Sequence, residues 1–96
     1  MNKGGFVYIL ASKPNGTLYI GVSSDLGRRI YQHKTSEVEG FTSKYKVHKL
    51  VWYEKHDRIE EAILRERQLK KWKRAWKLKI IEEFNPNWKD LYDDIA

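Results

Sequence analysis

The sequence predicts an α+β fold in which helices flank a small three-stranded antiparallel sheet, in the order β-β-α-β-α-α. Three short runs rich in β-branched and aromatic residues predict the strands, and a turn joins the first two of them. Between and after these runs, apolar residues recur at helical spacing. A chain of 96 residues is long enough for one modest core, so we expect a single domain over residues 1–96.

Residues 6–11 and 17–22 form a predicted β-hairpin. The segment between them contains Pro14-Asn15-Gly16, which supplies a turn and a site for a positive φ angle. Gly21 lies near the end of the second strand, at a place where the backbone has to make room for a neighbouring group.

The first helix is predicted to begin near Asp25 and to run to about residue 34, because Ser23-Ser24-Asp25 offers a capping hydroxyl and an early acid. The polar segment 35–46 contains Gly40 and is predicted to be a surface loop. Residues 48–55, with the sequence HKLVWYEK, are predicted to form the third strand. The LVWY centre of this strand suits a position that is buried on both sides.

Two more helices are predicted after the third strand. The second helix begins at Asp57, where Asp57 and Glu60 have the spacing of a capping box, and it continues through a basic stretch toward Arg74. The third should end before Asn85-Pro86 and carries three large apolar residues four apart: Trp76, Ile80 and Phe84. The tail is expected to pack back on the body through Trp88, Leu91 and Tyr92.

The positive charge of the chain is concentrated in one segment. The net charge is +6, and residues 65–79 hold eight Lys or Arg and one acid, whereas residues 82–96 hold five acids and one Lys. A solvated helix face is the ordinary explanation of such a stripe, but here Trp72 and Trp76 interleave the cations, which favours binding to nucleic acid. The residues predicted to contact it are Arg28, Arg65, Lys70, Lys71, Lys73, Arg74 and Lys77.

The composition also excludes several kinds of chemistry. The chain contains no cysteine, which removes disulfides, thiolate catalysis and cysteine-based zinc sites. The longest apolar run, residues 6–11, is too short for a signal-peptide core or a membrane span. We therefore expect a cytoplasmic protein.

Charged residues fall on faces that should be apolar. In the first helix, Arg29 and His33 share the face of Leu26 and Ile30, whereas Arg28 and Gln32 point elsewhere. Taken alone, an Arg and a His on such a face are more often structural residues, partly buried and hydrogen-bonded, than catalytic ones. The residues are more informative as a set, because Tyr8 and Tyr19 of the hairpin belong to the sheet that this face of the helix is expected to contact.

Glu66 presents the same anomaly with the opposite charge. It falls in the middle of an apolar arc on the second helix, which consists of Ile59, Ala62, Ile63 and Leu69. A carboxylate is kept on a buried face only when it is paired or bound to a metal. The alternative is an ordinary surface pair between Glu66 and Lys70.

Together these residues resemble the GIY-YIG nuclease family, and specifically its small stand-alone bacterial members. The resemblance rests on Phe6-Val7-Tyr8 followed by Tyr19-Ile20-Gly21, then Leu26, Arg29, His33, and Glu66 in a basic helix. It covers a core over residues 6–76, and the ending NPNWKDL extends it into the C-terminal helix and packed tail, residues 77–96.

The chain departs from the family pattern at a few positions. Phe6 and Val7 replace the first two residues of the first triplet, which is a common relaxation. Val22 stands where some members carry a lysine, so activation of a base by that lysine is not available here. Leu78 occupies the place of a late asparagine found in some members. The role of that asparagine is therefore either absent here or taken by Asn85.

The resemblance implies a phosphodiesterase that uses one divalent cation, Mg²⁺ or Mn²⁺. By this resemblance Glu66 is the metal ligand, Arg29 stabilises the phosphoryl transition state, and the general base is Tyr8, Tyr19 or His33. A tyrosine with a pKa near 10 is a poor base at neutral pH unless nearby positive charge lowers its pKa.

The function predicted from the sequence is thus a metal-dependent endonuclease acting on DNA, in repair or processing. One alternative is a nucleic-acid-binding module of the same fold that no longer cuts, and another is a protein that docks its basic helix on an acidic partner. Relatives often owe target choice to a second domain, so specificity here would come from a homodimer or from a partner protein.

Overall fold

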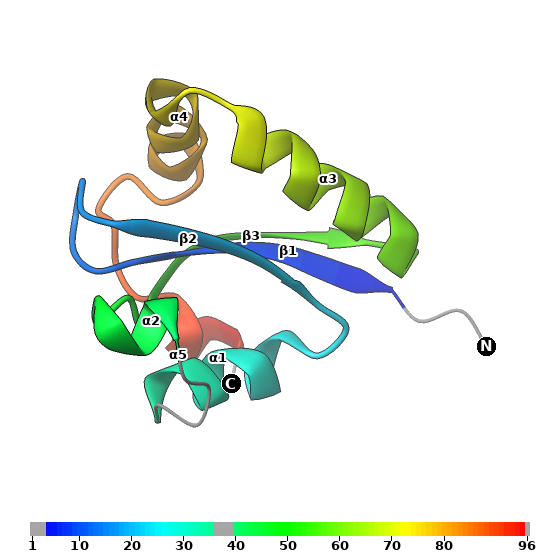
Figure 1. Cartoon of the computed structure of the whole chain (residues 1–96), viewed down its shortest axis with the longest axis horizontal. Helices are drawn as coiled ribbons and strands as arrows, with labels where there is room; N and C mark the ends of the chain where they lie inside the picture. Colours follow the sequence, from blue (N-terminus) through cyan, green and yellow to red (C-terminus); the bar gives the residue numbers. More distant parts are fainter. Residues whose placement is uncertain (1–3, 36–39, 96) are drawn as a thin grey trace.

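Three antiparallel strands form one sheet with the order β2-β1-β3, and helices cover both of its faces (Figure 1). The computed structural model describes residues 4–35 and 40–95. The elements are β1 (Gly5–Ala11), β2 (Leu18–Ser23), α1 (Leu26–Lys34), α2 (Phe41–Lys44), β3 (Lys49–His56), α3 (Ile59–Lys71), α4 (Arg74–Phe84) and α5 (Tyr92–Ile95). The predicted fold class is therefore confirmed.

Alternation along the central strand divides the core into two halves. Val7 and Ile9 point to one face of the sheet, where α3 and α4 lie, and Tyr8 and Leu10 point to the other, where α1, α2 and α5 lie (Figure 1). The strand is buried on both sides because helices cover both faces. Apolar burial on both faces provides most of the driving force that holds these helices in place.

The predicted hairpin is confirmed. β1 pairs with β2 in a register that sets Tyr8 opposite Gly21, and Asn15 in the connecting turn has a φ of 58°. On its other side β1 pairs with β3, where the register shifts between Ile9 and Leu10 and leaves Val51 as an extra residue. The predicted burial of β3 on both sides is also confirmed at its centre.

One predicted helix start is confirmed and another is wrong. The side chain of Asp25 accepts a hydrogen bond from the Arg28 amide at 3.2 Å, so the predicted start of α1 is confirmed. The predicted capping box at Asp57 is wrong, because α3 starts at Ile59 after Arg58, and no side chain among the described residues caps it.

The basic stretch does not form one continuous helix. α3 ends at Lys71, and Trp72 has the extended backbone angles φ −68° and ψ 149°, after which α4 starts at Arg74. The two helices meet at an angle in Figure 1. The predicted basic helix is therefore divided between two elements, and its cations point in more than one direction.

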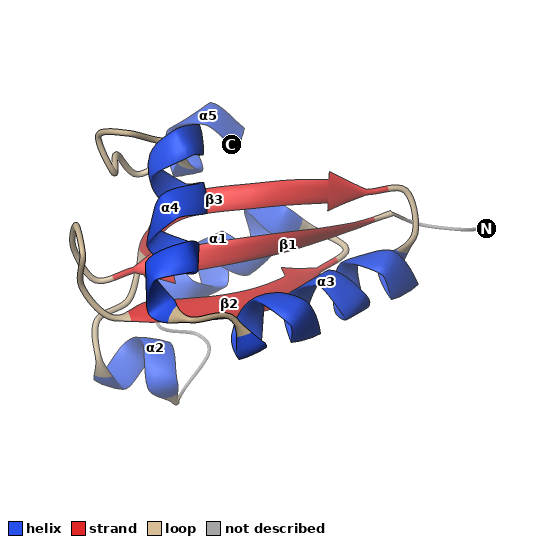
Figure 2. Ribbon diagram, turned by 90° about the horizontal axis from the view of Figure 1, so that it is seen from above, coloured by secondary structure: helices blue, strands red, loops and turns tan. Residues whose placement is uncertain are grey.

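The predicted loop 35–46 contains a short helix. Its residues 36–39 lie outside the described part of the chain, but residues 41–44 form α2 beside the edge strand β2 (Figure 2). The amide of Lys44 donates to the carbonyl of Gly40 at 3.0 Å, and the buried Thr42 anchors this turn to the body.

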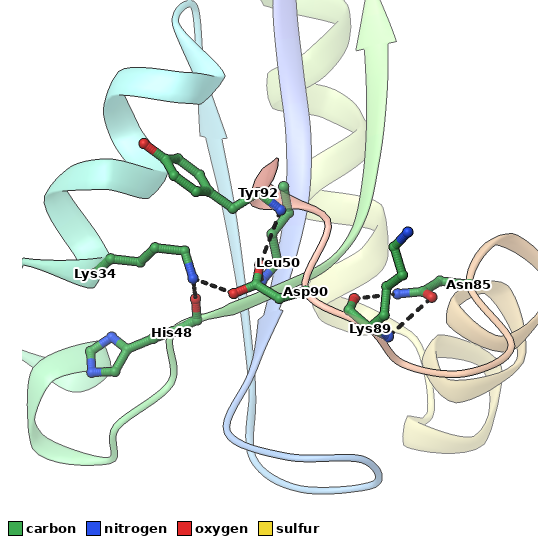
Figure 3. A network of polar contacts seen from close by, with 7 residues as sticks. All are labelled: Lys34, His48, Leu50, Asn85, Lys89, Asp90 and Tyr92. Atoms are coloured by element: carbon green, nitrogen blue, oxygen red, sulfur yellow. Dashed lines mark hydrogen bonds and ion pairs between the residues drawn. The ribbon is translucent and has the colours of Figure 1, made fainter. Parts of the chain in front are cut away.

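The tail packs on the body as predicted, and polar contacts fix it there (Figure 3). The Asp90 carboxylate accepts a charged hydrogen bond from Lys34 of α1 and another from the Leu50 amide of β3 at 3.2 Å. The Leu91 amide donates back to the Leu50 carbonyl at 2.8 Å. The tail therefore joins α1 to the edge strand β3.

Candidate active site

Tyr8 and His33 form the buried centre of the candidate site. Tyr8 points from the central strand toward α1, and its hydroxyl lies 3.1 Å from Nε2 of His33. The second ring nitrogen of His33, Nδ1, lies 3.0 Å from the Thr42 hydroxyl of α2. All three side chains are buried. The result is a hydrogen-bonded chain from the sheet through α1 to α2.

Tyr19 and Gly21 complete the sheet side of the cluster. The Tyr19 ring lies 6.4 Å from the Tyr8 ring and 5.5 Å from the His33 ring, measured between centroids. A Cβ on Gly21 would stand 2.4 Å from the Tyr8 hydroxyl oxygen. The absence of a side chain at Gly21 is thus what allows the Tyr8 phenol to lie across β2.

Arg29 is half-buried beside this cluster, whereas Arg28 is exposed, as their positions on the helix predicted. The Arg29 guanidinium donates to the side-chain oxygen of Gln32, one turn further along α1, at 3.4 Å. The positive charge of Arg29 acts on both neighbours, since it lowers the pKa of Tyr8 and of His33.

The environment makes the two buried groups neutral at physiological pH. Burial raises the pKa of Tyr8 to about 12, and Arg29 offsets only part of this rise. Burial, followed by the charges of Arg29 and His48, lowers the pKa of His33 to about 4. The positive charge of Arg29 therefore does not ionise Tyr8 at neutral pH, and neutral His33 keeps one nitrogen free of a proton.

Glu66 approaches the cluster from the opposite face of the sheet. Its side chain is 17% exposed, and one carboxylate oxygen lies 3.6 Å from the Lys70 ammonium, so it is both partly buried and weakly paired. The carboxylate is near enough to raise the pKa of Tyr8. Helix α3 packs on β1 and β2, and Figure 2 shows it along the β2 side of the sheet.

A surface cavity of about 330 Å³ lies where the two faces meet, along the free edge of β2. Its walls come from β2, α2, α3 and α4, through Leu18, Tyr19, Ile20, Phe41, Lys70 and Lys77. A ligand in this cavity would contact Tyr19 on one side and, on the other, Lys70, which pairs with Glu66.

The donor atoms near this edge suit a hard cation better than a soft one. The described residues contain no group of three or more His, Cys, Asp or Glu that could hold a metal, so a cation at Glu66 would need water or substrate oxygens as further ligands. A single carboxylate fits Mg²⁺ or Mn²⁺, which keep waters and substrate oxygens as their other ligands, and it does not fit a structural Zn²⁺ site.

The basic residues predicted to contact nucleic acid divide into two groups. Arg65 pairs with Glu54 at 3.1 Å, and Arg74 donates to the hairpin carbonyls of Asn15 and Gly16 at 2.8 Å and 2.6 Å. These two cations hold the fold together. The others are exposed or line the cavity: Arg28, Lys70, Lys71, Lys73 and Lys77.

Asn85 has a structural role. Its side-chain amide donates to the Val51 carbonyl at 3.2 Å. The same amide donates to the Lys89 carbonyl at 2.8 Å, and the side-chain oxygen accepts from the Lys89 amide (Figure 3). These contacts lie at β3, the strand on the far side of the sheet from β2. Asn85 therefore does not supply the role left empty at Leu78.

Fold and site together define a small α+β domain that carries a polar cluster at one edge of its sheet. The chain belongs to the GIY-YIG family: residues 4–88 match the family model described as the GIY-YIG catalytic domain. A UPF0213 protein of Staphylococcus saprophyticus, SSP2268, is 35% identical over 78 residues, which cover 81% of this chain and 94% of the relative.

Other relatives support the same assignment. UPF0213 proteins of Staphylococcus epidermidis and Staphylococcus aureus are 33% and 32% identical, and each alignment covers 81% of this chain and 94% of the relative. No solved structure matches the chain. Within the part of the chain that the structure describes, every helix is too short or too polar to cross a membrane.

Proposed function

We propose that this protein is a divalent-metal-dependent endonuclease that hydrolyses phosphodiester bonds in DNA. The observation that carries this proposal is the buried Tyr8–His33 pair beside the half-buried Arg29, with the Glu66 carboxylate on the other face of the sheet close enough to raise the pKa of Tyr8. A binding module has no need of a partly buried carboxylate beside a phosphate site, since like charges repel there.

Arg29 is the group best suited to hold the phosphate. Its guanidinium is half-buried, and its planar fork can donate two parallel hydrogen bonds to non-bridging phosphate oxygens. The trigonal-bipyramidal transition state carries more charge on these oxygens than the ground state does. Arg29 therefore stabilises the transition state more than the bound substrate.

The Tyr8–His33 pair can move a proton away from an attacking water. Neutral His33 accepts the hydrogen bond of the Tyr8 hydroxyl at Nε2, 3.1 Å away, and because the pKa of His33 is about 4 it holds a proton relayed through Tyr8 only transiently. Thr42 fixes the ring orientation through Nδ1. Tyr19, which is partly exposed at the cavity, is the phenol that a substrate would contact directly.

Glu66 is the residue that would hold the cation. When bound, a divalent cation supplies neutralisation of the phosphate charge and a lower pKa for a coordinated water. The weak pair with Lys70 would be replaced in that state, which frees the exposed ammonium of Lys70 for a phosphate.

The experiment that tests the proposal is cleavage of plasmid and branched DNA by wild type, Glu66→Gln and Glu61→Gln. Glu61 lies on the same helix but is exposed, so its replacement is the matched control. We expect Mg²⁺-dependent cleavage by wild type and Glu61→Gln, and loss of roughly 10² or more of the rate in Glu66→Gln.

Undiminished cleavage by Glu66→Gln would overturn the role of this carboxylate. Binding of DNA by wild type without cleavage in Mg²⁺ or Mn²⁺ would instead support the alternative, a nucleic-acid-binding module of the same fold.

A further inference from the structure

Three aromatic rings form a row that begins in the candidate active site and ends in solvent. The Tyr19 ring stacks on Phe41 of α2, with centroids 6.1 Å apart and planes 29° apart, and Phe41 lies 4.7 Å from Tyr45. Phe41 is 45% exposed and Tyr45 is 48% exposed. Rings buried this incompletely contribute little to the core, so their clustering calls for another explanation.

The row is surrounded by positive charge. The Lys44 ammonium lies 5.4 Å from the centre of the Tyr45 ring, and Lys70 and Lys77 line the cavity that Phe41 and Tyr19 share. Figure 2 shows α2 beyond the free edge of β2, so the row extends away from the sheet. Aromatic faces beside cations are what a nucleic-acid strand with unstacked bases requires.

We propose that Phe41 and Tyr45 form a stacking site for unpaired nucleobases next to the candidate active site. This proposal rests on the proposed function and names the substrate class more closely: a single-stranded segment of nucleic acid. Paired bases in a duplex present only their edges, whereas a single strand offers the flat faces that rings can stack on.

The position of Tyr19 connects this site to the chemistry. Tyr19 belongs to the row through Phe41 and to the candidate active site through His33, whose ring lies 5.5 Å away. A base stacked on the row would therefore bring its adjoining phosphate to the edge of β2, where Arg29 and Glu66 approach from the two faces of the sheet.

A second aromatic pair, the half-buried Trp72 and the exposed Trp76, is less suited to this role. Trp72 and Trp76 contact each other at 5.9 Å, with Arg65 over one ring and Lys73 over the other. Arg65 is already held by Glu54, and the pair lies at the junction of α3 and α4, on the face of the sheet opposite to His33.

The experiment measures equilibrium binding by fluorescence anisotropy, in EDTA so that no cleavage takes place. The probes are short fluorescein-labelled single-stranded DNA, the same sequence as RNA, and a blunt DNA duplex, all at one salt concentration. The proteins are wild type, Phe41→Ala, Tyr45→Ala, Phe41→Tyr and Phe84→Ala. Phe84 is 48% exposed and lies against Tyr53 of β3, so it is a matched control.

We expect Phe41→Ala and Tyr45→Ala to weaken single-strand binding by roughly 5-fold to 100-fold each, which corresponds to the loss of one stacked base. Duplex binding should change less than 2-fold, and Phe41→Tyr and Phe84→Ala should bind like wild type. Comparison of the DNA and RNA probes shows which of the two nucleic acids the site binds more tightly.

Equal losses on single strands and duplex, or no loss on either, would overturn the stacking site. Circular dichroism of each variant identifies a loss that comes from unfolding, and Phe41→Tyr then decides, because it keeps the ring without a cavity. Cleavage that does not depend on Glu66 would contradict the proposed function but would leave these binding ratios unaffected.

Discussion

The backbone of Gly21 lies directly against the Tyr8 phenol, so closely that a Cβ at position 21 would stand 2.4 Å from the hydroxyl oxygen and 2.5 Å from Cζ. Tyr8 cannot move aside freely, because it is buried and hydrogen-bonded to His33. The second strand of the hairpin therefore sets the position of the tyrosine on the first.

We expect Gly21→Ala to destabilise the fold by about 1–3 kcal/mol through overpacking and to lower cleavage by roughly 10²-fold, because Tyr8 is displaced. Thermal unfolding and a plasmid cleavage assay measure the two effects. Gly27→Ala is the control: apart from its chain neighbours and the backbone of α1 itself, no described atom lies within 4 Å of its added Cβ, and alanine favours the helix α1. Wild-type activity in Gly21→Ala would show that the close approach is unimportant.

Two neighbouring arginines of α1 should respond differently to replacement. Arg29→Lys keeps the charge but loses the bidentate fork, so we expect single-turnover cleavage to fall by about 10² while DNA binding changes little. Arg28 is exposed, and Arg28→Lys should leave both quantities close to wild type. Equal effects of the two substitutions on rate and binding would mean that α1 presents only a basic face.

The buried His33 should make stability depend on pH. Its pKa is about 4 in the folded protein and near 6.5 in the unfolded chain, so between these values only the unfolded chain binds the proton. Stability is thus fully present above pH 6.5 and is lost as the pH falls toward 4. We expect about 2 kcal/mol of this loss between pH 7 and pH 5.

Urea unfolding of wild type and His33→Gln at the two pH values measures this contribution. Glutamine does not titrate, so the variant should lose less stability than wild type by about that amount. The same pH dependence in both proteins would show that His33 does not titrate in this range.

Asp90 should stabilise the fold from the tail. Asp90→Ala removes acceptors from Lys34 and from the amides of Leu50 and Tyr92, and we expect a loss of about 1–3 kcal/mol in the free energy of unfolding. Asp93→Ala, at an exposed position of α5, should change it by less than about 0.5 kcal/mol. Urea unfolding compares the two, and indistinguishable midpoints would argue against a structural role for the tail.

Local signals in the sequence predicted the parts of the fold that local forces decide. The hairpin follows from Pro14-Asn15-Gly16 between two strand-forming runs, and the start of α1 follows from the Asp25 cap. Helical spacing also placed Arg29 and His33 together on the inner side of α1, where the structure has them. The positions of these candidate residues could therefore be predicted, although their roles stay a proposal.

Features held by distant contacts could not be predicted in this way. Helix α2 has only four residues and no apolar period, and the bond between Thr42 and His33 helps to hold it. For the same reason Thr42 was missed as a member of the site. The break at Trp72 has no Gly or Pro to announce it, and the cation that follows, Arg74, is held by the hairpin carbonyls.

The contact between Lys34 and Asp90 joins two residues that are 56 positions apart in the chain (Figure 3). During synthesis, a ribosome that has not yet released the residues around position 90 carries a chain in which α1 has no such anchor. The helix that presents Arg29 and His33 is then held less firmly against the sheet. Full assembly of the cluster thus comes only after the residues around position 90 have been translated and released.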